Sequence, residues 1–323
     1  MHLADRHIRA LALVLSSLFL QPCAAFAESC QLKRAASVPM RLDAGYQLLV
    51  PVKLNGDSDA ELLVDTGAYA STLTSSESDK LGLSPESIGS YVYGAGGRAI
   101  NQRVTIKMQL DHLVSGAEAF LVMPDALYGH SGSAGLFGAD FLANYDLDLD
   151  FGGKKMNLFS QDHCEGHVVY WTQEFIQTPV EIDDGHHVLL PVTLNGRKLR
   201  AMLDTGAGVS LMTWANASRL FDLDKDSSDM VESGKVVTAD GKQLSSYRHH
   251  FQTLEVAGIT FHDPTIVIIE NGERRDASVG SHINASQTDM PDIILGIREL
   301  SKLHLYIAYG EHMLYATPAG AGQ

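Results

Sequence analysis

Two aspartates, Asp65 and Asp204, occupy the same place in two copies of one seven-residue pattern. The pattern reads DTGAYAS at residues 65–71 and DTGAGVS at residues 204–210, and each copy follows an apolar run. Two carboxylates that share one proton can hydrolyse an amide without a metal, because one accepts a proton from water while the other donates one to the carbonyl oxygen. The sequence therefore predicts an acid–base site made of one carboxylate from each copy.

The two copies belong to a longer internal repeat. Residues 51–56 (PVKLNG) recur as residues 191–196 (PVTLNG), at an offset of 140, and the aspartates follow at an offset of 139. A pair of ordinary turns would also be rich in Asp and Gly. Two unrelated turns, however, would not keep this register or share the Ala and Ser that follow each aspartate.

The elements around both aspartates read as short strands. Runs of Val, Ile, Leu and Tyr alternate with Gly, Asn or Asp, which predicts a mainly β protein. Each half ends with a similar signal, LFG at residues 136–138 and ILG at residues 294–296, followed by a short helix and a strand with alternating side chains at 145–151 and 303–307. Short helices are also expected at 76–81 and 213–220.

The residues next to each aspartate have types that support a carboxylate pair. We expect Thr66 and Thr205 to form hydrogen bonds across the axis that relates the halves. Gly67 and Gly206 permit a tight backbone path that brings amide N–H groups toward the carboxylates. These four residues, with the two aspartates, form the predicted site.

In these motifs the sequence resembles the retropepsin-like and pepsin-like aspartic proteases, most closely the single-chain periplasmic enzymes of bacteria. The resemblance covers roughly residues 45–316 and includes the apolar-apolar-Gly segments, which in this family pack behind the catalytic loops. It implies a bilobal aspartic-protease fold of two pseudo-symmetric β-barrel-like lobes. It also implies hydrolysis of an extended polypeptide substrate, with no cofactor and no metal. Each half is longer than a retroviral subunit and shorter than a pepsin lobe, so the specificity stays open.

The resemblance also implies hairpins that close over the substrate. In the first half, residues 91–97 alternate and reach a Gly-rich tip, and in the second an Asp-Gly turn lies at the corresponding place; an ordinary hairpin is the alternative for both. The expected substrate-binding residues are Tyr93, Gly94, Gly96, Gly97, Asp240 and Gly241.

The expected organisation is a signal peptide at 1–27, an N-terminal lobe at 28–160, a connection at 161–184 and a C-terminal lobe at 185–323.

The first residues predict export. Arg6 and Arg9 precede an apolar run at 10–20, and Ala-Phe-Ala at 25–27 fits a signal-peptidase site, which predicts a periplasmic or secreted protein. Removal of this segment leaves Cys30 and Cys164, which we expect to form a disulfide in an oxidising compartment. Two free buried thiols are the alternative.

The formal net charge of −15 argues against nucleic acid and anionic lipid as partners. We expect no membrane association after signal removal, and a monomer. The histidines that could suggest a metal lack the spacing of known sites, and we expect them to be exposed; they are His163, His167, His186, His187, His249 and His250. A peptide-binding or scaffolding protein with an idle pair of aspartates is the alternative function, and a general degradative role is not separated from a narrow processing role.

Overall fold

Each half of the chain begins with a β-hairpin that leads to an aspartate. The turn residues Asn55 and Asn195 have φ of 48° and 47°, and the glycine after each also has a positive φ, as tight hairpin turns require. The first turn is one residue longer, because Leu54 pairs with Ser58 whereas Leu194 pairs with Arg197. This extra residue accounts for the change in repeat offset from 140 to 139. The hairpins are β3 (Leu48–Leu54) with β4 (Ser58–Val64), and β16 (Val188–Leu194) with β17 (Arg197–Leu203).

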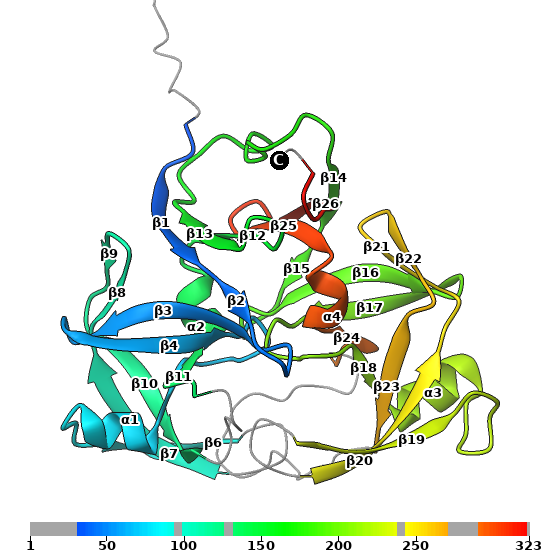
Figure 1. Cartoon of the computed structure of the whole chain (residues 1–323), viewed down its shortest axis with the longest axis horizontal. Coiled ribbons are helices and arrows are strands. Elements are labelled where there is room, and N and C mark those ends of the chain that lie inside the picture. Colours follow the sequence, from blue (N-terminus) through cyan, green and yellow to red (C-terminus); the bar gives the residue numbers. More distant parts are fainter. Residues whose placement is uncertain (1–30, 94–98, 126–131, 238–242, 271–289, 322–323) are drawn as a thin grey trace, which may run out of the picture. The chain divides into compact units, whose positions relative to one another are not determined.

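The computed structural model describes residues 31–93, 99–125, 132–237, 243–270 and 290–321, and these pack as one compact unit. The first hairpin lies within a ten-stranded sheet of order β6-β7-β10-β5-β11-β4-β3-β8-β9, with β2 also paired to β3 (Figure 1). Its other strands are β2 (Arg41–Leu42), β5 (Thr72–Thr74), β6 (Glu86–Tyr93), β7 (Ala99–Ile106), β8 (Met108–Leu110), β9 (Leu113–Val114), β10 (Glu118–Met123) and β11 (Gly135–Phe137).

The second half repeats this sheet strand for strand. Its order is β19-β20-β23-β18-β24-β17-β16-β21-β22, with β15 paired to β16. Two ten-stranded sheets of the same topology confirm the predicted bilobal, mainly β fold. The remaining strands are β15 (Glu181–Ile182), β18 (Leu211–Thr213), β19 (Val231–Val237), β20 (Gln243–His250), β21 (Thr253–Val256), β22 (Ile259–His262), β23 (Thr265–Ile269) and β24 (Ile293–Leu295).

The helices also occur in matching pairs. α1 and α3 begin after Thr74 and Thr213, whose hydroxyls accept a hydrogen bond from the backbone N–H three residues later, as N-cap residues do. The second pair begins after Gly138 and Gly296. The helices predicted at 76–81 and 213–220 are thus present, as are those after each glycine. Their bounds are α1 (Ser75–Lys80), α2 (Ala139–Leu142), α3 (Trp214–Phe221) and α4 (Ile297–Leu300). None of the helices in the described ranges has the length and apolar character that crossing a bilayer requires.

A third sheet of six strands joins the two halves, and the sequence repeat did not predict it. Its order is β1-β13-β12-β25-β26-β14, and the central antiparallel pair takes one strand from each half. The strand β14 comes from the predicted connection at 161–184, which is therefore more than a linker. The strands are β1 (Arg34–Pro39), β12 (Asp146–Asp150), β13 (Lys155–Phe159), β14 (Ile176–Pro179), β25 (Leu303–Ala308) and β26 (Met313–Pro318).

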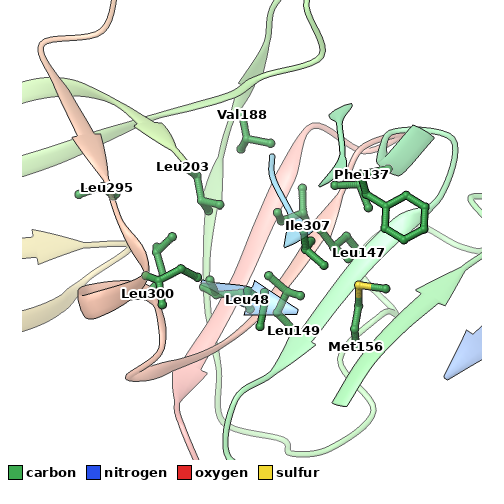
Figure 2. Packing of buried hydrophobic residues seen from close by; sticks show 14 of the residues in the cluster. Leu48, Phe137, Leu147, Leu149, Met156, Val188, Leu203, Leu295, Leu300 and Ile307 are labelled. Atoms are coloured by element: carbon green, nitrogen blue, oxygen red, sulfur yellow. The ribbon is translucent and has the colours of Figure 1, made fainter. Parts of the chain in front are cut away.

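One large apolar cluster supports all three sheets. Figure 2 shows Leu48 and Leu149 of the first half near Leu300 of the second, and each is at most 1% exposed. Alternate residues of β12 point into this cluster, since Leu147 and Leu149 belong to it. The two halves therefore share a core, which fixes the relative position of the loops that carry the aspartates.

Candidate active site

Both aspartates directly follow the inner strands of their sheets. The backbone N–H of Asp65, after β4, donates to the carbonyl oxygen of Phe137 at 2.9 Å, and that of Asp204, after β17, donates to Leu295 at 3.0 Å. Phe137 and Leu295 end β11 and β24, which run parallel to β4 and β17. Each aspartate is thus held at the end of a buried strand pair.

The glycine of each loop faces the carboxylate of the other half. A Cβ atom on Gly67 would lie 2.4 Å from Cγ of Asp204, and one on Gly206 would lie 2.2 Å from Cγ of Asp65. Only a hydrogen atom fits in so short a space, which explains why both positions are glycine. The structure therefore places the two carboxyl groups beside each other, across the boundary between the halves.

Backbone N–H groups approach the carboxylates from within their own loops. Gly67 donates to Oδ1 of Asp65 at 3.0 Å. Asp204 receives two such bonds on Oδ1, from Gly206 at 2.8 Å and from Ala207 at 3.1 Å. A hydrogen bond from the backbone of Ala68 also lowers the pKa of Asp65, so the equivalent Gly and Ala residues of the two loops favour the charged form of both aspartates.

The two threonines bind the loops to each other. The hydroxyl of Thr66 donates to the carbonyl of Leu203 at 2.8 Å and accepts from the N–H of Thr205 at 3.1 Å. The hydroxyl of Thr205 donates to Val64 at 2.7 Å and accepts from the N–H of Thr66 at 3.1 Å. Both side chains are fully buried. The hydrogen bonds across the axis that the sequence predicts are present.

Residues behind the loops fix their position, and only some of them could be predicted from the sequence. The N–H groups of Gly138 and Gly296 donate to the hydroxyls of Ser71 and Ser210, each at 3.0 Å. A Cβ on Gly138 would lie 2.5 Å from the backbone of the first loop, and one on Gly296 2.3 Å from that of the second. The segments with sequence LFG and ILG thus pack directly behind the loops.

Two carboxylates that the motif did not single out complete this arrangement. The hydroxyl of Ser71 donates to Oδ1 of Asp140 at 2.7 Å, and the hydroxyl of Ser210 donates to Oε2 of Glu299. Asp140 lies two residues after its glycine and Glu299 three residues after. An acidic residue shortly after each apolar-apolar-Gly segment was the available signal, but the unequal spacing hides the match.

The electrostatics distinguish the two carboxyl groups. Both are surrounded by protein yet retain partial exposure to solvent. Burial, followed by the negative charge of Asp204, raises the pKa of Asp65 well above its ordinary value. Burial also raises the pKa of Asp204, but the N–H of Gly206 opposes this. Such a pair ionises in two steps and retains a shared proton between them.

The hairpins expected to cover the site are present, but their tips lie outside the described residues. β6 pairs with β7 as far as Tyr93 opposite Ala99, and β19 pairs with β20 as far as Val237 opposite Gln243. The tip residues Gly94, Gly96, Gly97, Asp240 and Gly241 are not described, so their role in binding substrate stays a prediction. Cys164 is disulfide-bonded, whereas Cys30 is outside the described ranges and this pairing also stays a prediction.

The expectation of exposed histidines is correct for His167, His186 and His250 and wrong for the other three, His163, His187 and His249, which are partly buried. The side chain of His163 is 4% exposed, with its Nε2 2.5 Å from a buried carboxylate, Asp146. The side chain of His187 is 20% exposed and bound to a carboxylate of its own turn. His163 lies in the segment after β13 and its partner lies on β12, so spacing between histidines gave no sign of its burial.

Two matching ten-stranded sheets, each with an Asp-Thr-Gly loop at the end of an inner strand, define an aspartic-protease fold. The chain matches the family model described as Aspartyl protease over residues 50–141 and again over residues 190–298. These matches span more than half of its 323 residues, and the chain belongs to the aspartyl protease family. No curated protein matches the sequence. A similar solved structure is Basic 7S globulin from soybean, at 10% identity and a TM-score of 0.49, with 89% of this chain and 95% of that chain covered.

Proposed function

We propose that this protein is an aspartic endopeptidase that hydrolyses peptide bonds between Asp65 and Asp204. The observation that carries the proposal is the approach of the two carboxyl groups, one from each half, in a site where burial raises the pKa of both. One can then be ionised while the other stays protonated, which is the state that acid–base hydrolysis requires.

The reaction follows from that state. The ionised carboxylate takes a proton from a water molecule as the water oxygen attacks the peptide carbonyl carbon, and the protonated carboxyl gives its proton to the carbonyl oxygen. A geminal diol results. When the diol collapses, the carbon–nitrogen bond breaks, the nitrogen takes the proton that came from water, and a diol hydroxyl returns its proton to the other carboxylate. Both groups recover their starting states.

The proposal extends to substrate and location. An extended polypeptide is the substrate that the family implies, bound by one chain acting as a monomer under the hairpins β6–β7 and β19–β20. We propose that it works in the periplasm or outside the cell, since disulfides such as that of Cys164 persist in oxidising compartments. N-terminal sequencing of the purified protein should find Glu28 as the first residue; an intact Met1 would contradict export by a cleaved signal.

The test is incubation of the purified protein with a peptide library across a pH series, beside Asp65→Asn as control. We expect cleavage with a bell-shaped dependence on the acid side, no loss with a chelator, and no cleavage by the control. A rate that keeps rising through about pH 9, where carboxyl pairs are fully ionised, would refute the mechanism. Peptide binding without cleavage at any pH would favour the idle scaffold instead.

A further inference from the structure

The turns that precede β3 and β16 have the same backbone geometry. In the first, Oδ1 of Asp43 accepts from the N–H groups of Gly45 and Gln47, both at 2.8 Å. In the second, Oδ1 of Asp183 accepts from Gly185 at 2.8 Å and from His187 at 2.9 Å. The repeat therefore places a neutral residue, Gln47, and a titratable one, His187, at equivalent positions.

These two positions lie opposite the two aspartates in the hairpins. In the second half Val188 pairs with Leu203, so the next pair in the same register is His187 with Asp204. In the first half the register of β3 and β4 likewise leads to Gln47 opposite Asp65. Directly opposed residues of an antiparallel pair project to the same face, with Cβ atoms about 5 Å apart. Gln47 is thus the cross-strand neighbour of Asp65, and His187 is the cross-strand neighbour of Asp204. Of these two neighbours only His187 can carry a positive charge.

The side chain of His187 is held firmly in its turn. Its Nδ1 lies 2.9 Å from Oδ2 of Asp183, and its Nε2 is buried and has no hydrogen-bond partner among the described residues. Asp184 and His186, the other titratable groups of the turn, line a pocket together with Asp183. The carboxylates that interact with His187 are Asp183 on its own turn, through Nδ1, and Asp204 across the hairpin, through its charge.

We propose that His187 is a positioning residue that fixes unequal roles for the two aspartates: it keeps Asp204 as the ionised group that takes the proton from water, and leaves Asp65 as the protonated group. This inference rests on the proposed function. An imidazole ordinarily carries a positive charge below about pH 6.5, where a carboxyl pair acts. Two further observations agree. The hydrogen bond between the two carboxyl groups raises the pKa of Asp65 and lowers that of Asp204. Burial raises the pKa of Asp204, and the N–H of Gly206, Asp65, the N–H of Ala207 and, with the smallest effect, the charge of His187 all oppose it.

The repeat supplies matched variants for the test. His187→Gln copies Gln47, a residue that already fits this turn, and removes the charge. His187→Lys keeps a positive charge at the position, and Gln47→His transfers the imidazole to the other half. Because the two carboxyls titrate as a pair, each is read alone by carbon-13 NMR of labelled aspartate, Asp204 in an Asp65→Asn background and Asp65 in an Asp204→Asn background.

We expect His187→Gln to raise the titration midpoint of Asp204 by about one unit, the lower end of the effect of a nearby opposite charge, and His187→Lys to restore it. Gln47→His should lower the midpoint of Asp65 by a similar amount. In chains that retain both aspartates, the acid limb of kcat/KM should move to higher pH with His187→Gln. A midpoint of Asp204 that does not change in His187→Gln, or one of Asp65 that does not change in Gln47→His, would overturn the assignment. If the wild-type protein cleaves no peptide, the proposed function fails, and the NMR midpoints still decide whether His187 acts on Asp204.

Discussion

Replacement of Thr66 by Val tests whether the hydrogen bonds between the loops hold the two halves together. Valine has nearly the shape of threonine but no hydroxyl, so it leaves the carbonyl of Leu203 and the N–H of Thr205 without their partner in a fully buried place. An unsatisfied buried group costs about 1–3 kcal/mol. With two groups affected, we expect a loss of about 2–6 kcal/mol in the free energy of unfolding.

Thr66→Ser is the matched control, because serine keeps the hydroxyl and loses one methyl group, at a cost of about 0.8 kcal/mol. The free energies come from urea unfolding of the purified proteins. The equivalent pair of substitutions at Thr205 should give the same ranking, since its hydroxyl makes the same two contacts. The rate of hydrolysis per folded molecule should change little. A valine variant that is no less stable than the serine variant would refute the role of these hydrogen bonds.

Three further experiments test the electrostatics of Asp65, the close approach of the loops and the disulfide. Burial and a negative neighbour raise the pKa of Asp65, so its contribution to stability is full below the unfolded pKa and is lost as pH rises through the folded pKa. The Asp65→Asn variant should therefore lose less stability than the wild type between about pH 4 and pH 7. An equal loss in thermal unfolding would contradict this. Gly206→Ala should abolish hydrolysis because its Cβ meets the Asp65 carboxylate, whereas Gly116→Ala, with no atom nearer than 3.8 Å, should leave it unchanged; equal activities in a peptide assay would count against the geometry. Cys30 and Cys164 should be linked to each other, and mass spectrometry of the non-reduced protein that finds either as a free thiol would exclude that pairing.

The sequence was sufficient to predict the lobes and the positions of the aspartates. The reason is that the repeat is local: each Asp-Thr-Gly loop follows its own hairpin, and β11 and β24 carry a recognisable apolar-apolar-Gly segment. The helices could be predicted because Thr74 and Thr213 cap them in a standard way. These features depend on neighbours in the sequence, so their patterns can be read directly.

The six-stranded sheet depends on contacts that no local pattern contains. Alternation in β12 shows that Asp146 and Asp148 share one face, and polar residues of this kind usually face water. In the structure both are fully buried, because His163 binds Asp146 at 2.5 Å and His304 binds Asp148 at 2.6 Å. His304 comes from β25 of the other half. The pairing of strands more than 150 residues apart cannot be inferred from either strand alone.

The same limit explains why the sequence alone predicts an exposed side chain for His187. The spacing of His187 along the chain does not fit a metal-binding pattern. When the two halves are aligned, His187 corresponds to Gln47, and the hairpin register places these two residues opposite Asp204 and Asp65. The informative signal was therefore a difference between equivalent positions of the repeat.

The central claim is that one chain forms one active site from Asp65 and Asp204. The most direct measurement is the rate of peptide hydrolysis by Asp65→Asn, by Asp204→Asn and by an equimolar mixture of the two, with the mass of each species determined in solution. If the pair forms within a chain, both variants and the mixture are inactive and the mass is that of a monomer. If like halves pair between chains, a dimer carries two independent sites, and each single variant keeps a substantial share of activity. Retained activity in either variant, together with a dimeric mass, would contradict the account.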